Sequence, residues 1–456
     1  MKKPNILFVL VDQLRRDSVS HYGGPVQTPN LDRLATQGTS FSQAYCVNPM
    51  CTPARGAIFT GRFTHALNDE KGNPFYFNNR TVNPDEISIA KSLGDVGYKC
   101  GYIGKWHMHR QGDNCVPPEK RIGFDDFWAG GFSEEQYADE GIEAVRGGRE
   151  WQPDLKVDLA KKYMTAKVKQ DDPFFLVVSM NPPHRPYTLP EDKQYLLEQA
   201  REQISTEHIR QNVPERLRDQ ALEEYIQYHA NVMGIDEKVG ELMDSLEKLG
   251  VDDNTLVVFT SDHGENLYGH GCLGKNQFHE EAAAVPMLMR WNNVIESERM
   301  VSDFINHTDV LPTLLDLIGT TVPERAQGKS FAAFLRGEEE RGPQQSAYLE
   351  INHPWWDYKT YMGPQGHRRC LVTESYKLVL MDSQLGSGGA IPWELWDRKN
   401  DPYELNNLAN DPGYYPLISE LVQQMWKEWM LPTDDHYFYD RTLSGLREEY
   451  IEYDEE

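Results

Sequence analysis

The sequence predicts a doubly wound, mostly parallel α/β sheet, followed by a smaller α+β domain built on a short antiparallel sheet. Three observations carry this prediction. Continuous apolar runs recur through the first 335 residues, they alternate with helical patterns, and polar side chains follow where the runs end. The charged run at 336–341 marks a boundary, so we assign residues 1–335 to the large domain and 336–456 to the small one.

The individual elements follow from the spacing of the apolar residues. In the large domain, continuous apolar runs predict strands at 5–11, 99–103, 173–179, 255–260 and 285–290. Helical spacing predicts helices at 28–34, 87–96, 216–249 and 310–318. The third of these contains Gly234 and Gly240, so it fits either one long helix or two. In the small domain, we expect a helix at 417–429 and strands at 346–351, 369–373, 377–381 and 393–396.

The chain is acidic and has enough apolar residues for a large core. Hydrophobic residues make up 39% of the 456 residues and aromatic residues 11%, which excludes an intrinsically disordered chain. Lys and Arg number 46 against 71 Asp and Glu, which gives a formal net charge of −25. Such a surface repels nucleic acid and acidic membranes, so neither is expected as a partner. An anionic substrate therefore requires a local cluster of cations.

Cysteine spacing and hydropathy argue against several further classes of protein. The six cysteines include no C-x-x-C and no close pairs, which argues against a zinc ribbon, a thioredoxin-like motif or a dense disulfide framework. No apolar run approaches the roughly 18–20 residues that span a bilayer. The run after Lys3 passes directly into Asp12 without a cleavage site, so we interpret it as a buried strand. The expected location is cytoplasmic if the chain is complete, and periplasmic or secreted if a leader was removed.

Two polar pairs follow two predicted core strands. Asp12-Gln13 comes directly after the first strand, and Asp262-His263 follows the strand at 255–260. Each acid alone is also compatible with a turn or a helix cap. Ligands of open α/β sheets bind beyond the carboxyl ends of the strands, so neighbouring strands would bring these side chains together as a divalent-cation site. Their oxygens suit Ca²⁺ or Mg²⁺, whereas the His nitrogen shifts the preference toward Mn²⁺ or Zn²⁺.

The stretch Cys51-Thr-Pro-Ala-Arg55, continued by Gly-Ala-Ile-Phe-Thr-Gly-Arg62, is the most informative in the chain. Taken alone, it is compatible with an ordinary helix start, because Pro53 suits a first helical turn. The whole stretch resembles the C-x-P-x-R…T-G-R signature of the type I sulfatases, members of the alkaline phosphatase superfamily. The resemblance implies an alkaline phosphatase-like sheet, oxidation of Cys51 to formylglycine, and a maturing enzyme that performs it.

Four further positions match the sulfatase pattern. Lys105 and His107 lie in a K-x-H segment, His184 lies in an H-x-P-Y segment, and Lys275 follows the second polar pair. The resemblance implies that both lysines contact sulfate oxygens. It also implies that His184 is the general acid for the leaving alcohol and that His107 is the base of the second step. The resemblance covers nearly the whole chain, including an "ELYD…NDPxExxNL"-like segment at 393–408.

The resemblance also implies the cofactors. In the family, a strand-end acidic pair and a later Asp-Asn or Asp-His pair surround Ca²⁺ beside formylglycine, whose hydrate attacks the sulfate ester. Gln13 stands where many members have a second Asp, and His263 where many have Asn. Ca²⁺ is therefore the first expectation, and Mn²⁺ and Zn²⁺ remain open. The family assigns stabilisation of the hydrate to Arg55, one helical turn after Cys51.

The expected function is hydrolysis of a sulfuric ester, with a sulfated carbohydrate as the substrate because that is the commonest class in the family. The nearest alternative is a phosphonate or phosphate ester hydrolase of the same superfamily, which can also carry Asp-Gln and Asp-His pairs. Lys105 and His107 favour the sulfatase, because such relatives tend to have neutral hydroxyl residues there. A silent sulfated-glycan-binding protein is the third alternative; it predicts the loss of a site residue, and none is missing.

Several aromatic and basic residues are candidates for the wall of the substrate pocket. They are Trp106, His109, Arg185, Tyr268, His270, His353, Trp355, Trp356, Arg368 and Arg369. Aromatic rings can stack on sugar faces, and arginines can pair with carboxylate or sulfate groups. Core packing or surface exposure explains each of them equally well.

Overall fold

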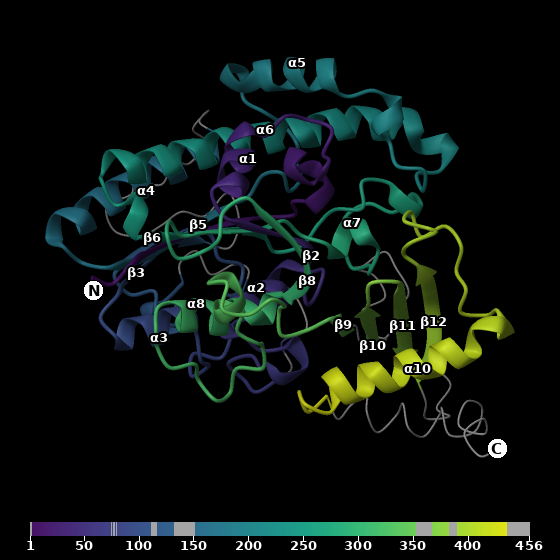
Figure 1. The fold of residues 1–456 in the computed structure, drawn as a ribbon. Helices are drawn as coiled ribbons and strands as arrows, with labels where there is room; N and C mark the ends of the chain where they lie inside the picture. The colour runs from purple at the N-terminus through teal and green to yellow at the C-terminus, as the bar shows by residue number, and fades with distance from the viewer. Residues whose placement is uncertain are drawn as a thin grey trace.

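An eight-stranded sheet forms the centre of the protein (Figure 1). The computed structural model describes residues 2–73, 75, 78, 80–110, 116–131, 151–352, 367–382 and 390–435. The strands, in spatial order, are β4 (Phe127–Gly131), β3 (Lys99–Lys105), β5 (Phe174–Met180), β1 (Asn5–Val11), β6 (Thr255–Ser261), β7 (Met287–Arg290), β2 (Thr39–Tyr45) and β8 (Arg299–Asn306). Only β7 runs antiparallel to its neighbours among these strands, so the predicted mostly parallel sheet is confirmed.

Helices cover both faces of this sheet, as the doubly wound prediction requires. One face carries α1 (Pro29–Thr36), α4 (Gln152–Gln170) and α6 (Arg218–Lys248), and α5 (Gln194–Gln203) packs on α6. The other face carries α2 (Cys51–Thr60), α3 (Ile89–Asp95), α8 (Val310–Leu317) and α9 (Ala332–Leu335). A short helix, α7 (Glu280–Ala283), precedes β7.

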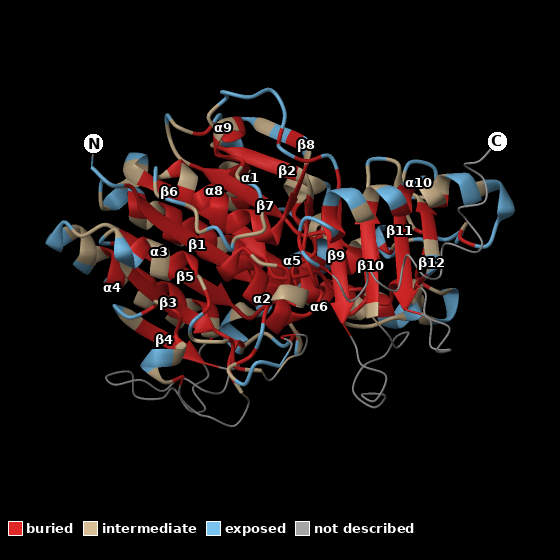
Figure 2. Cartoon of the chain, turned by 90° about the horizontal axis from the view of Figure 1, so that it is seen from below, coloured by how far each residue is buried: buried red, intermediate tan, exposed pale blue. Residues whose placement is uncertain are grey.

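The central strands are buried on both faces, and this explains their continuous apolar runs. Side chains of β1 alternate between the two layers. Ile6, Phe8 and Leu10 enter one hydrophobic cluster, while Leu7 and Val9 enter the other. Figure 2 shows the central strands β1, β5 and β6 in the colour of buried residues.

The long helical pattern at 216–249 forms a single helix, α6, without a break at either glycine. Both glycines lie where another element approaches the helix closely. A Cβ at Gly234 would lie 2.4 Å from Trp151, and one at Gly240 would lie 2.4 Å from Asn30. Close packing of these neighbours against α6 therefore accounts for the two residues that weaken the helix signal in the sequence.

Helix α1 starts at Pro29, one residue after the predicted start, and the preceding Thr28 does not cap it with its side chain. The buried carboxylate of Asp236, on α6, accepts hydrogen bonds from the N–H groups of Asn30 at 3.2 Å and Leu31 at 2.7 Å. The cap is thus supplied by a residue some 200 positions away in sequence. In the 3₁₀ turn His307–Asp309 that leads into α8, in contrast, Asn306 and Asp309 form a local capping box.

A second, four-stranded antiparallel sheet forms the C-terminal part of the protein. In spatial order it consists of β12 (Ala390–Asp397), β11 (Tyr376–Asp382), β10 (His367–Val372) and β9 (Ala347–Asn352). One face packs on α10 (Tyr415–Met425), which continues as a π-helical turn at Trp426–Met430. The other face packs against the large sheet and α7 (Figure 1). The predicted boundary between residues 335 and 336 stays a prediction.

The structure also bears on the state of the cysteines and on membrane-spanning segments. The five described cysteines are all free thiols, and the sixth, Cys115, lies outside the described residues. Within the described part of the chain, no helix combines the length and the apolar character needed to cross a membrane.

Candidate active site

Four adjacent parallel strands deliver the predicted site residues to one edge of the large sheet. The strands β3, β5, β1 and β6 are consecutive neighbours, so their carboxyl ends lie side by side. Val11 of β1 pairs with Ser261 of β6, and Asp12 and Asp262 each follow directly. The condition set by the sequence, that the two strands be neighbours, is therefore met. In order of the strands, the delivered residues are Lys105 and His107, His184, Asp12 and Gln13, and Asp262 and His263.

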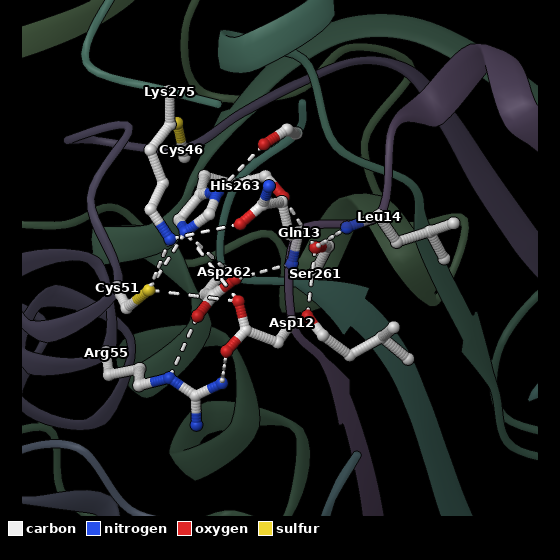
Figure 3. Close-up of polar contacts among 12 residues, drawn as sticks. Asp12, Gln13, Leu14, Cys46, Cys51, Arg55, Ser261, Asp262, His263 and Lys275 are labelled. Carbon is white, nitrogen blue, oxygen red and sulfur yellow. Dashed lines mark hydrogen bonds and ion pairs between the residues drawn. The ribbon is translucent and has the colours of Figure 1, made fainter. Parts of the chain in front are cut away.

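Cys51 meets these strand ends as the first residue of α2. Its Sγ lies 3.2 Å from Nε2 of His263 and 3.8 Å from Oδ1 of Asp12. Cys51, Asp12, Asp262 and His263 are fully buried, and their potential ligand atoms all lie within 4.8 Å of one another. Figure 3 shows their polar ends pointing toward one another.

The orientation of His263 fits a metal ligand. Its Nδ1 lies 2.8 Å from the carbonyl oxygen of Gly264, which as an acceptor requires the proton on Nδ1. Nε2 is thereby directed toward the carboxylates, at 3.6 Å from Asp262 and 3.8 Å from Asp12. Two carboxylates, a ring nitrogen with a fixed partner and the nearby amide of Gln13 form a donor set that a divalent cation fits.

Gln13 adopts a strained backbone conformation that its neighbours hold in place. Its φ is +66°, in the left-handed region that residues other than glycine rarely occupy. Its N–H donates to Oδ1 of Asp262 at 3.1 Å, and its carbonyl oxygen accepts from the hydroxyl of Tyr228 at 2.7 Å. Strain of this kind persists only where the surroundings fix the residue, and it is frequent at functional sites.

Arg55 lies beneath the cluster and is completely buried. Its Nε donates to Oδ2 of Asp262 at 2.9 Å, and its Nη2 lies 3.6 Å from Oδ2 of Asp12 (Figure 3). Its Nη1 donates to the carbonyl oxygen of Lys105 at 2.6 Å and to the hydroxyl of Ser179 at 2.8 Å. The guanidinium therefore fixes both carboxylates and the end of β3, rather than contacting Cys51 through a hydrogen bond.

Two lysines surround the thiol. Nζ of Lys275 lies 2.8 Å from Sγ of Cys51, and Nζ of Lys105 lies 3.8 Å from it and forms an ion pair with Asp12. Burial and the charge of Asp12 would raise the pKa of the Cys51 thiol, but the two lysines and His263 outweigh them and hold it well below its usual range. The protein thus concentrates positive charge at one point of an acidic molecule.

The two remaining histidines differ in exposure. His107 is buried, with a φ of +56°, and its carbonyl oxygen accepts from the Thr52 hydroxyl at 2.5 Å. Burial and the charge of Lys105 lower its pKa well below the usual value. His184 is partly exposed, and its Nδ1 lies 2.7 Å from the Arg185 carbonyl oxygen. Burial lowers its pKa to about 4, an effect that Asp12 opposes and Lys105 reinforces.

Family models and known proteins that match this chain agree with the geometry of the site. Residues 4–320 match the family described as Sulfatase, and residues 268–430 match the family described as N-sulphoglucosamine sulphohydrolase, C-terminal. The chain belongs to the sulfatase family. An ulvan-active sulfatase from Formosa agariphila is 28% identical, and the match covers 93% of this chain and 81% of that protein. An N-acetylglucosamine-6-O-sulfatase from Bacteroides thetaiotaomicron is also 28% identical, with 92% and 85% covered.

Solved structures agree with the family and with the fold. A sulfatase structure from Bacteroides fragilis superimposes with a TM-score of 0.84 at 27% identity, covering 97% of this chain and 98% of that one. The phosphonate monoester hydrolase of Agrobacterium radiobacter superimposes with a TM-score of 0.73 at 20% identity, covering 95% and 96%. The second likeness concerns the fold alone, and the predicted alkaline phosphatase-like architecture is confirmed.

Some residues that contact this sulfatase site were not predicted from the sequence. Ser179 and Tyr102 accompany Arg55, Tyr228 holds the Gln13 backbone, and Glu265 contacts the Gln13 side chain. Ser179 and Glu265 stand at or just after predicted strands, and their position was an available signal. Tyr228 lies within a long helical pattern that marks no residue for the site.

The candidate residues for the pocket wall lie in different surroundings. Trp106 lies inside an aromatic cluster of the core, and Arg369 is buried against Asp435, so neither faces a substrate. Arg185, which directly follows His184, and Tyr268 both contact the carboxylate of Glu224. The other described candidates contact protein groups: His109 contacts Thr81, His270 contacts Asn212, and Arg368 contacts Gln277. His353, Trp355 and Trp356 lie outside the described residues.

Proposed function

We propose that this sulfatase removes sulfate from an O-sulfated carbohydrate, with the side chain at position 51 as the nucleophile. The observation that carries the proposal is the surrounding of Cys51. A fully buried side chain at a helix start is contacted by Lys275, His263 and Asp12 at distances of 2.8, 3.2 and 3.8 Å. A cysteine placed only for packing has no need of this set of charges.

Formylglycine fits this position, and a separate maturing enzyme would have to form it from Cys51. When present, the group supplies a hydrated aldehyde, whose hydroxyl is a nucleophile and whose second hydroxyl allows sulfate to be released. Lys275 and Lys105 lie within 3.8 Å of Sγ and would hold hydroxyl and sulfate oxygens at the same place. Arg55 keeps Asp262 and Asp12 in position from below, which supports the nucleophile indirectly.

Asp12, Gln13, Asp262 and His263 would hold one divalent cation. Three oxygen donors and one nitrogen favour Ca²⁺ as the first choice, with Mn²⁺ and Zn²⁺ as alternatives. When bound, such a cation would polarise the sulfuryl oxygens, favour the ionised nucleophile and offset the charge of the two buried carboxylates.

The two histidines take the proton-transfer roles. Since Nδ1 of His184 faces the Arg185 carbonyl oxygen, Nε2 is the atom that can give a proton to the leaving alcohol. A bound sulfate ester brings negative charge to the ring and raises its pKa from about 4, so that Nε2 carries the proton when it is needed. His107 stays neutral because its pKa is lowered, which suits a base in the second step.

The carbohydrate substrate is supported by the relatives. Two relatives that align over more than nine tenths of this chain are named as an ulvan-active sulfatase and an N-acetylglucosamine-6-O-sulfatase. To test the proposal, the converted, cation-loaded protein is incubated with defined sulfated saccharides, and the released sulfate is measured. We expect release from a subset of the saccharides, whereas activity confined to aryl sulfates or choline sulfate would overturn it.

A phosphonate or phosphate ester hydrolase is the second candidate, favoured by Gln13 and His263, which such relatives can also carry. Against it, Lys105 contacts Cys51 and Asp12 directly, where those relatives tend to have a neutral hydroxyl residue. Rates on matched aryl sulfate, aryl phosphate and phenylphosphonate esters distinguish the two. We expect the sulfate ester to be the best substrate, and a preference for either phosphorus ester would contradict the sulfatase proposal.

A further inference from the structure

The carboxylate of Glu265 joins two parts of the site and has no role in the steps above. Glu265 is fully buried, three positions after Asp262. Its Oε1 accepts hydrogen bonds from the N–H groups of Leu267, at 3.1 Å, and of Gly274. Its Oε2 accepts from Nε2 of the Gln13 side chain. One side chain thus connects the end of β1 with the loop that carries Lys275.

The contacts of the Gln13 amide determine which of its two ends faces the nucleophile. An amide can be turned so that its oxygen and nitrogen exchange places, and the neighbours decide between the two orientations. A carboxylate whose oxygens take up N–H groups is an acceptor, and the ammonium of Lys275 has only donors. With Nε2 toward Glu265, Oε1 of Gln13 accepts from Nζ of Lys275 at 3.1 Å. The reverse orientation would oppose donor to donor and acceptor to acceptor.

We propose that Glu265 is a positioning residue that directs the oxygen of the Gln13 amide toward the cation site and holds Lys275 beside Cys51. The inference rests on the cation site of the proposed function. The backbone of Gln13 is already fixed at both its N–H and its carbonyl oxygen, so rotation of the amide is the freedom that remains. Gly274, which donates to Glu265, directly precedes Lys275, whose Nζ lies 2.8 Å from Sγ of Cys51.

The substitution Glu265→Gln tests the direction of the amide. It keeps the volume and an oxygen for the two backbone N–H groups, but it presents an NH₂ group to Gln13. The Gln13 amide then inverts and turns its own NH₂ group toward the cation. Calorimetric titration of metal-free protein with Ca²⁺ should show an affinity about 10- to 100-fold below that of the wild type. Glu350→Gln is the matched control, since Glu350 is also fully buried and accepts backbone N–H groups, and its Ca²⁺ affinity should be unchanged.

A double-mutant cycle with Gln13→Glu separates positioning from a general loss of stability. In that background two carboxylates oppose each other, and Glu265→Gln restores a donor–acceptor pair. We therefore expect Glu265→Gln to lower the Tm of metal-free protein when position 13 is Gln and to raise it when position 13 carries the glutamate.

Effects of the same sign in both backgrounds, or unchanged Ca²⁺ affinity in Glu265→Gln, would overturn the proposal. Both measurements use protein with an unconverted Cys51 and no substrate. A failure of the proposed activity would leave them unaffected. If the wild type bound no Ca²⁺, Ca²⁺ would fall as the first choice of cation, and the sign of the Tm change would still decide whether Glu265 orients the amide.

Discussion

Two buried clusters of this protein contain the same residue types but differ in how their charges are arranged. One is the strand-end cluster of Asp12, Cys51, Arg55, Asp262 and His263. The other, which we name the latch cluster, consists of His65, Glu350, Arg369 and Asp435, where the segment after α2 meets the small sheet and residues near the end of the described chain. Both combine a histidine, an arginine and two carboxylates without exposure to solvent, apart from the partly buried His65.

In the latch cluster the protein's own groups satisfy the charges. Glu350 accepts hydrogen bonds from the Thr64 hydroxyl at 2.7 Å and from the His65 N–H at 3.1 Å, and it contacts Nδ1 of His65 at 2.8 Å. Arg369 forms a two-pronged contact with Asp435, which also accepts from the hydroxyl of Tyr348. The histidine and the arginine thus pair with the two carboxylates inside the cluster, and such a network stabilises a fold.

In the strand-end cluster the charges converge on a reactive atom instead. Lys275, Lys105 and His263 all approach Sγ of Cys51, and Nη2 of Arg55 makes no hydrogen bond within the described structure. The comparison teaches that residue types do not identify a site. The two clusters differ in their contacts. In the latch cluster the charged groups pair with one another, whereas in the strand-end cluster they surround one reactive atom.

The substitution with the largest expected effect on the strand-end cluster is Cys51→Ala. Removal of the nucleophile should lower sulfate release by at least about 10⁴-fold, with the thermal unfolding midpoint retained. The measurement is a sulfate-release assay together with a melting curve. Cys370→Ala, which alters another buried free thiol, is the control and should keep its activity. An active Cys51→Ala enzyme would show that the charges around Cys51 serve another purpose.

A smaller effect is expected for His184→Ala, which removes the proposed proton donor. Turnover of a sulfated saccharide should fall by about 10²- to 10⁴-fold. Hydrolysis of 4-nitrophenyl sulfate should fall much less, because that leaving group needs no proton. Exposed His208 provides the control substitution His208→Ala. Equal losses on both substrates would remove His184 from the role of general acid.

The latch cluster should respond in stability rather than in rate. Arg369→Met leaves the buried carboxylate of Asp435 without the arginine that pairs with it and should lower the free energy of unfolding by about 3–5 kcal/mol. Denaturant unfolding measures this loss, and kcat per folded molecule should be unchanged. A large fall in kcat with full stability would mean that the latch cluster takes part in the reaction.

The smallest expected effect concerns pH. Burial lowers the pKa of His65, but Glu350 and Asp435 outweigh it, and the net pKa is raised above the usual value. The folded protein therefore binds this proton more tightly than the unfolded chain, which stabilises it at low pH. That contribution is lost as the pH rises through the raised pKa.

The stability difference between wild type and His65→Gln should therefore narrow as the pH rises above about 6.5, by about 1.4 kcal/mol for each unit by which the pKa is raised. Denaturant unfolding at a series of pH values measures it. A difference that widens with pH would show that His65 is neutral in the folded protein.

The sequence predicts the strand-end cluster well because its residues are placed by regular elements. Apolar runs identify the strands, and polar residues at their carboxyl ends must share one edge once the strands are neighbours. The positions of Asp12 and Asp262 follow from this rule alone, whereas Lys105 was singled out by its match to the sulfatase pattern. The same rule says nothing of β2 and β8, whose runs are interrupted by polar residues and were not predicted as strands.

Contacts between distant side chains were beyond the reach of the sequence. Asp236 caps α1 from α6, and Glu265 meets Gln13 across 252 positions, because tertiary packing supplies what local patterns do not show. Latch residues such as Arg369 were even considered as pocket residues, since an arginine pattern does not reveal whether a carboxylate already accompanies it. The roles of the individual site residues remain predictions.

The most direct test of the account is a crystal structure of the converted protein soaked with Mn²⁺, read by its anomalous signal. The account predicts one strong peak between Asp12, Gln13, Asp262 and His263, next to the modified side chain at position 51. A peak at the latch cluster, with none between the strand ends, would contradict it.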